Sequence, residues 1–87
     1  MENRIEDEIK KAIIDAMEAD IAIEEIKDDD YLLAGGYNFD SIMIIETVMR
    51  LEAAFSVVFE DNELTPEVFT SVKTIADLIR TKLGEVA

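Results

Sequence analysis

The pair Asp40-Ser41 is the part of this sequence whose residue types and position most clearly suggest chemistry. It follows a stretch rich in Asp and Gly and precedes an apolar, periodic segment, so a helix is expected to begin there. Asp at such a position accepts a hydrogen bond from a backbone N–H group. A Ser hydroxyl in the first turn lies where the helix dipole and unpaired N–H groups stabilise an attached phosphate. The pair is therefore either a helix cap alone or a cap beside a site of phosphoester attachment.

The sequence lacks the groups on which most hydrolytic enzymes depend. Its 87 residues include no Cys and no His, which removes the usual base of Ser and Cys triads and the preferred zinc ligands. An EF-hand is also excluded: counting from Asp28, Leu32 and Leu33 occupy the fifth and sixth loop positions, and Pro66 is the sixth from Asp61. We therefore expect no enzyme activity of its own and no metal site.

Composition and charge restrict the fold and the partners. With 49% hydrophobic residues, 33% charged residues and a net charge of -13, the chain is expected to form one folded domain over residues 1–87. The negative charge disfavours nucleic acid and anionic lipid and favours proteins with basic docking patches. No apolar run is long enough to span a membrane, no signal-peptide pattern is present and no Cys is available for disulfides. We expect a cytoplasmic monomer.

Apolar residues recur at helical spacing in three segments, roughly residues 4–19, 41–55 and 71–83. Asn3 with Glu6 resembles a capping box for the first segment. Ser71 is a suitable cap for the third, which ends at Gly84. The inward stripes are Ile5, Ile9, Ala12, Ile13, Ala16 and Met17 in the first segment, Ile44, Val48, Leu51 and Phe55 in the second, and Val72, Ile75, Ala76, Ile79 and Leu83 in the third.

The connections between these segments are irregular. Residues 20–40 form a long loop that we expect to be held to the core by apolar side chains, and loops of this length are most often functional. Residues 56–59 are predicted as an extended segment tucked into the core. Thr65-Pro66-Glu67 is a typical helix start, which predicts a fourth, short helix. The apolar anchors of the long loop are predicted to be Ile23, Ile26, Tyr31, Leu32 and Leu33.

The segment that begins at Ser41 carries a second apolar stripe, formed by Ile42, Ile45 and Met49. A surface helix needs only one such stripe. The second stripe either lies buried beneath the long loop or is exposed as a docking patch beside Ser41. In the second case, the flexible Met side chain would suit contact with several partners in turn.

The order and spacing of these elements resemble the acyl carrier protein family over almost the whole chain. The most specific parts are Gly-Tyr-Asn-Phe-Asp-Ser-Ile at 36–42, Glu-Leu-Thr-Pro-Glu at 63–67 and Ser-Val-Lys-Thr-Ile-Ala-Asp-Leu-Ile at 71–79. The resemblance implies an all-α, four-helix carrier bundle with three main helices, one short helix and a long loop between helices one and two. It implies a non-enzymatic carrier of acyl intermediates in fatty-acid, polyketide or related specialised biosynthesis.

The resemblance also assigns roles to residues. Ser41 would receive 4'-phosphopantetheine from coenzyme A, through a separate phosphopantetheinyl transferase that uses magnesium, and the arm's thiol would hold the acyl group as a thioester. Asp40 would cap the helix and be recognised by the transferase. Acyl ligase, synthase or acyltransferase enzymes would dock on the second helix. The docking residues implied are Ile42, Ile45, Glu46, Met49 and Glu52.

Two departures from the family pattern bear on the cargo. Met43, Arg50, Ala53 and Ala54 reduce the acidity that fatty-acid carriers usually have on this helix, which suggests a specialised carrier. Three residues separate Gly35-Gly36 from Asp40, whereas the pair nearly adjoins the Asp/His-Ser of peptidyl carriers, so acyl cargo is favoured. An aminoacyl or peptidyl carrier is the alternative. An acidic helical adaptor or inhibitor of basic proteins is an alternative of a different class.

Overall fold

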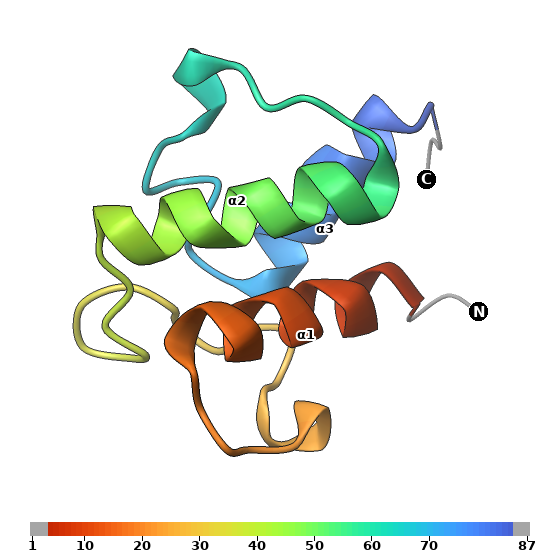
Figure 1. Cartoon of the computed structure of the whole chain (residues 1–87). Helices are drawn as coiled ribbons and strands as arrows, with labels where there is room; N and C mark the ends of the chain where they lie inside the picture. The colour runs from red at the N-terminus through yellow and green to blue at the C-terminus, as the bar shows by residue number, and fades with distance from the viewer. Residues whose placement is uncertain (1–3, 85–87) are drawn as a thin grey trace.

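Three α-helices form the framework in the computed structural model, which describes residues 4–84: α1 (Arg4–Met17), α2 (Ser41–Phe55) and α3 (Val72–Lys82). Two short 3-10 helices, η1 (Ile23–Glu25) and η2 (Asp61–Glu63), interrupt the long connections. Figure 1 shows α1 and α2 lying antiparallel, with α3 packed behind them. No β-strand occurs in residues 4–84, so the predicted all-α fold is confirmed.

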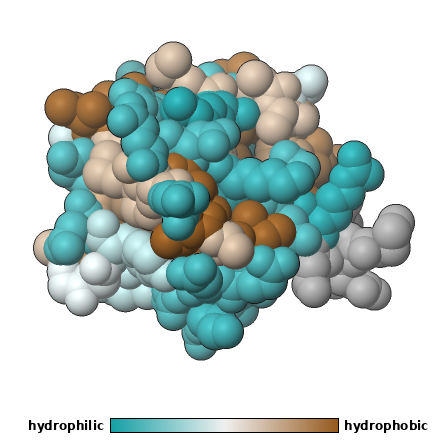
Figure 2. Space-filling model, turned by 60° about the horizontal axis from the view of Figure 1, so that its bottom comes forward, coloured by the Kyte–Doolittle hydropathy of each residue, from teal (hydrophilic) through white to brown (hydrophobic). Residues whose placement is uncertain are grey.

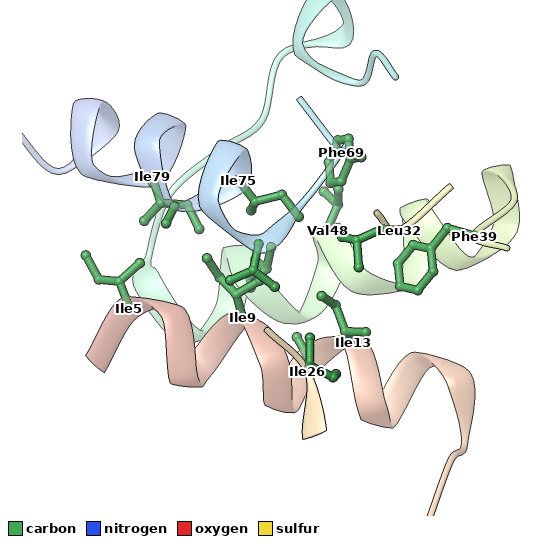
Figure 3. Close-up of a cluster of buried hydrophobic side chains, with 14 of the residues drawn as sticks. Ile5, Ile9, Ile13, Ile26, Leu32, Phe39, Val48, Phe69, Ile75 and Ile79 are labelled. Carbon is green, nitrogen blue, oxygen red and sulfur yellow. The ribbon is translucent and has the colours of Figure 1, made fainter. Parts of the chain in front are cut away.

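The apolar stripes predicted for the three helices meet in one buried cluster. Ile9 and Ile13 of α1, Leu51 of α2 and Ile75 and Ile79 of α3 are fully buried. In Figure 3, Ile5 and Ile79 lie toward one end of this cluster, while Leu32, Val48 and Phe39 lie toward the other. Burial of such side chains stabilises a fold by about 1.5–3 kcal/mol each. The other buried apolar residues are Ala12, Ile26, Phe59, Phe69, Val72 and Ala76.

The loop between α1 and α2 is attached to the core as predicted, through the buried side chains of Ile26 and Leu32. Tyr31 was expected to be an anchor as well, but about half of its side chain is exposed, so this prediction was wrong. The core position is taken by its neighbour Leu32, and Leu33 is partly buried against the same cluster.

The carboxyl end of the chain agrees with one expectation and differs from another. The short fourth helix, expected to last about one turn, is a single turn after Pro66, in which the N–H groups of Val68 and Phe69 both donate to Thr65 O at 3.2 Å. The turn ends because Phe69 is drawn into the core and Ser71 immediately caps α3. Leu83 was predicted to face inward but is 39% exposed, since it lies beyond the last turn of α3.

The predicted tuck of residues 56–59 is confirmed for Phe59, which is buried next to Phe69, but not for Val58, which is 69% exposed. Ser71 accepts a hydrogen bond from Thr74 N–H, as expected of a helix cap. The predicted cap of α1 at Asn3 lies outside the described residues.

An ion pair joins the two ends of the described chain. Arg80 of α3 donates to both carboxylate oxygens of Glu6 in α1, at 2.8 and 2.9 Å. The hydrogen bonds from Arg80 hold the pKa of the Glu6 carboxyl below its ordinary value, in spite of the opposing effect of partial burial. The pair therefore fixes α1 against α3.

Hydrophilic side chains cover most of one face of the molecule (Figure 2). Figure 2, which turns the bottom of Figure 1 toward the viewer, shows mostly hydrophilic side chains with smaller apolar areas between them. Within residues 4–84, no helix combines the length and the apolar character needed to cross a membrane.

Candidate functional site

The segment that leads into Asp40 is a compact, hydrogen-bonded loop. The N–H groups of Tyr37 and Phe39 donate to Tyr31 O and Leu32 O at 3.1 and 2.8 Å. Gly36 is required here, because a Cβ at this position would collide with the carbonyl of Tyr31. Phe39 is itself buried in the core. Backbone bonding and burial therefore fix the residue that directly precedes Asp40.

Two further contacts tie this loop to the rest of the molecule. Leu32 N–H donates to Thr70 O at 2.9 Å, just before α3. The Tyr37 hydroxyl donates to the Asp30 carboxylate at 3.2 Å, and desolvation, reinforced by the negative charge of Asp30, raises the pKa of the Tyr37 phenol. The phenol therefore stays protonated and able to donate at neutral pH.

Asp40 is the N-cap of α2 and Ser41 is its first residue. The Asp40 backbone is extended, and its Oδ1 accepts a hydrogen bond from Met43 N–H at 2.9 Å. Ser41 is exposed, at the end of the helix where the dipole is positive. A phosphoester on its hydroxyl would lie beside the remaining N–H groups of the first turn, which favour an anion.

The second apolar stripe of α2 is exposed rather than covered by the long loop. Ile42, Ile45 and Met49 are 68%, 52% and 62% exposed. Together with Glu46 and Arg50 they line a shallow groove of about 540 Å³. We call these five residues the α2 face; the face begins next to Ser41 and runs along the helix. Of the two positions that the sequence analysis left open for this stripe, buried beneath the loop or exposed beside Ser41, the structure shows the second.

The structure separates Glu52 from the other residues assigned to docking. Its carboxylate accepts a hydrogen bond from Phe59 N–H at 2.9 Å, which holds the chain where it turns back after α2. Glu52 does not line the groove, whereas Arg50 does. Arg50 was not among the predicted docking residues, although its i,i+4 spacing from Glu46 is a sequence signal for a pair on one helix face.

The acidic residues do not gather into a metal site. Among residues 4–84 no group of three or more potential metal-binding side chains was found. In the long loop, Asp28 pairs with Lys10 at 2.8 Å, and Asp30 accepts hydrogen bonds from Lys27 N–H and Tyr37. These carboxylates are used for holding the loop in place.

Comparison with known proteins identifies the family. The model of the phosphopantetheine attachment site matches residues 7–81. The chain belongs to this family. It is a phosphopantetheine-attachment carrier domain, and the cofactor of such domains is covalently bound 4'-phosphopantetheine.

A solved structure agrees with this assignment at the level of the fold. The carrier domain is similar to a chain from a crystal structure of an engineered Bradyrhizobium japonicum glycine:[carrier protein] ligase complexed with a carrier protein from Agrobacterium tumefaciens and ATP. The TM-score is 0.75 at 24% identity, and the match covers 90% of this chain and 99% of the other. No curated protein sequence gives a significant match.

Proposed function

We propose that Ser41 is the residue that carries 4'-phosphopantetheine and that the domain acts as a non-enzymatic, monomeric carrier. The observation that carries this proposal is the position of Ser41: it is exposed, it starts α2, and its neighbour Asp40 already caps the helix. The Ser41 hydroxyl is therefore not needed as a cap and is accessible to a modifying enzyme. When bound, the cofactor supplies a thiol that this chain, having no Cys, lacks.

The residues around Ser41 fit such a group. Asp40 occupies the Met43 N–H, so the other N–H groups of the first turn are left to stabilise a phosphodiester. The apolar side chain of Ile42, on the adjacent exposed surface, offers contact to an enzyme that approaches Ser41. We assign Asp40 a second role, in recognition by the phosphopantetheinyl transferase.

The test is the intact mass of the chain after incubation with coenzyme A, magnesium and a phosphopantetheinyl transferase. The native chain is expected to gain one phosphopantetheine, and Ser41→Ala to gain none. Ser56→Asn is the matched control, since Ser56 is also exposed and lies at the other end of α2, in a left-handed conformation that Asn tolerates. Modification of Ser41→Ala, or no gain by the native chain, would refute the assignment.

The cargo that we propose is an acyl group held as a thioester, for fatty-acid, polyketide or related specialised biosynthesis. The three-residue spacing between Gly36 and Asp40 supports acyl cargo, and the low acidity of α2, which carries only Glu46 and Glu52 as acids, favours a specialised pathway. The partners would be an acyl ligase, synthase or acyltransferase that binds α2 at Ile42, Ile45, Glu46 and Met49, while Glu52 keeps the end of α2 in shape.

Aminoacyl cargo is the second candidate, because the similar fold belongs to a structure of a carrier protein with a glycine:[carrier protein] ligase. Acyl and aminoacyl cargo are distinguished by loading the holo domain in two parallel reactions. One reaction contains glycine, ATP and an amino acid:[carrier protein] ligase, and the other contains fatty acids, ATP and an acyl ligase. Thioester formation is read by intact mass and confirmed by its reversal with hydroxylamine. A thioester that forms in only one of the two reactions identifies the cargo class.

A further inference from the structure

The charge of this carrier domain is distributed unevenly around α2. The chain has 21 acidic residues and a net charge of -13, but α2 contains only two acids, Glu46 and Glu52, and one base, Arg50. The Glu52 carboxylate binds Phe59 N–H at the end of the helix. The helix itself therefore carries a net charge of only -1, and the acid nearest to Ser41 is the N-cap Asp40.

The remaining acid on the α2 face is largely neutralised. Arg50 Nη1 lies 3.6 Å from Glu46 Oε1 and donates to Glu46 O at 3.1 Å. Arg50 remains 41% exposed, so its other donors can reach a partner. The α2 face thus offers apolar contact from Ile42, Ile45 and Met49 beside one acid and one base that pair with each other, and both charged side chains remain partly exposed.

A surface of this kind fits an enzyme and not a second copy of the chain. Two copies with a charge of -13 repel one another. A few exposed apolar side chains beside a charged one suit an encounter in which the apolar anchors give the affinity and the charge selects the partner.

We propose that the α2 face docks enzymes that present an apolar patch with a carboxylate opposite Arg50, and that Arg50 disfavours enzymes with a basic patch there. This inference rests on the proposed carrier function and revises the expectation of basic docking patches for this face. The acidic remainder of the surface can still attract basic regions of a partner enzyme at longer range. Contact at α2 is governed by Ile42, Ile45 and Met49 and by the sign of the charge at residue 50.

The experiment measures kcat/KM for transfer of phosphopantetheine by a transferase whose carrier-binding surface is basic. Arg50→Glu is expected to raise kcat/KM by about two- to five-fold and to make it fall with salt, as expected for a new exposed ion pair. Lys73→Glu is the matched control: it changes the net charge equally, but Lys73 is exposed on α3. Its kcat/KM is expected to stay within about two-fold of the native value.

A charge swap completes the test. The transferase's basic residues are changed singly to Glu, and each variant is assayed with the native chain and with Arg50→Glu. At one position the preference is expected to reverse, with the native chain becoming the better substrate. The proposal would be overturned if Arg50→Glu and Lys73→Glu had equal effects, or if Arg50→Glu lost activity. It would also be overturned if no transferase substitution reversed the preference between the native chain and Arg50→Glu.

Two other outcomes have distinct meanings. Absence of transfer to every variant would refute the carrier function itself, whereas transfer without coupling would refute only the role of Arg50. A dimer seen by sedimentation equilibrium and abolished by Met49→Glu would show that a second copy covers the α2 face, and would also overturn this proposal.

Discussion

Replacing Glu6 by Gln tests the link between the two ends of the described chain. The Glu6 side chain is 12% exposed and that of Arg80 is 26% exposed, so the pair is neither fully buried nor free in solvent. Loss of one partner costs about 3–5 kcal/mol in a buried pair and less than about 1 kcal/mol in an exposed one. We expect Glu6→Gln to lower the free energy of unfolding by about 2 kcal/mol and the melting temperature by roughly 10 °C.

The pH dependence of this loss follows from the direction of the Glu6 pKa shift. The folded-state pKa is lowered, so the ionised carboxylate stabilises the fold fully above the unfolded pKa of about 4.3. That stabilisation is lost as the pH falls through the lower, folded-state pKa. The difference between the native chain and Glu6→Gln should therefore be constant near neutral pH and shrink below about pH 4.3.

The assay is urea unfolding followed by circular dichroism at a series of pH values. Glu8→Gln is the matched control on the same helix, because it removes the same charge, while the pair between Glu8 and Lys11 is longer, at 3.6 Å, and more exposed. This control is expected to cost less than about 0.5 kcal/mol. Equal stability of the two variants, or a difference that does not shrink in acid, would refute the reasoning.

Three further substitutions probe the α2 helix and its approach. Met49→Glu places a charge on the exposed α2 face, so we expect an unchanged melting temperature and about a ten-fold lower kcat/KM for phosphopantetheine transfer; unfolding instead would show that the residue is interior. Thr47→Val should raise the free energy of unfolding by about 1 kcal/mol in urea titrations, because the buried Thr47 hydroxyl has no hydrogen-bond partner among the described residues; destabilisation would reveal a partner. Gly36→Ala forces a Cβ against the Tyr31 carbonyl, so we expect a loss of about 2 kcal/mol, measured in the same way, and a neutral result would mean that the loop adjusts freely.

Local sequence patterns were sufficient to predict the three main helices and the approximate position of the site. The cap at Asp40 depends on a hydrogen bond between near neighbours, and the second apolar stripe at Ile42, Ile45 and Met49 follows from helix periodicity, although the sequence left open whether that stripe was buried or exposed. Such short-range interactions can be read from one sequence.

Long-range contacts could not be predicted in this way. The Glu6–Arg80 pair joins residues 74 positions apart, and the Glu52–Phe59 bond depends on how tightly the chain turns after α2. The turn that begins at Pro66 stops where Phe69 is buried and Ser71 caps α3. In each case the outcome was decided by packing between distant segments.

The backbone bond from Leu32 to Thr70 has a further consequence for how cargo travels. It is joined by a second one, from Lys73 N–H to Asp28 O at 2.8 Å, and together they anchor the 28–32 region of the loop to the beginning of α3. The loop that leads into Asp40 and Ser41 is thus held against α3 by backbone hydrogen bonds. On the proposed carrier function, movement of the cargo must come from the rotatable bonds of the prosthetic arm and from tumbling of the whole domain, so two enzyme active sites served in one encounter must both lie within the arm's reach of Ser41.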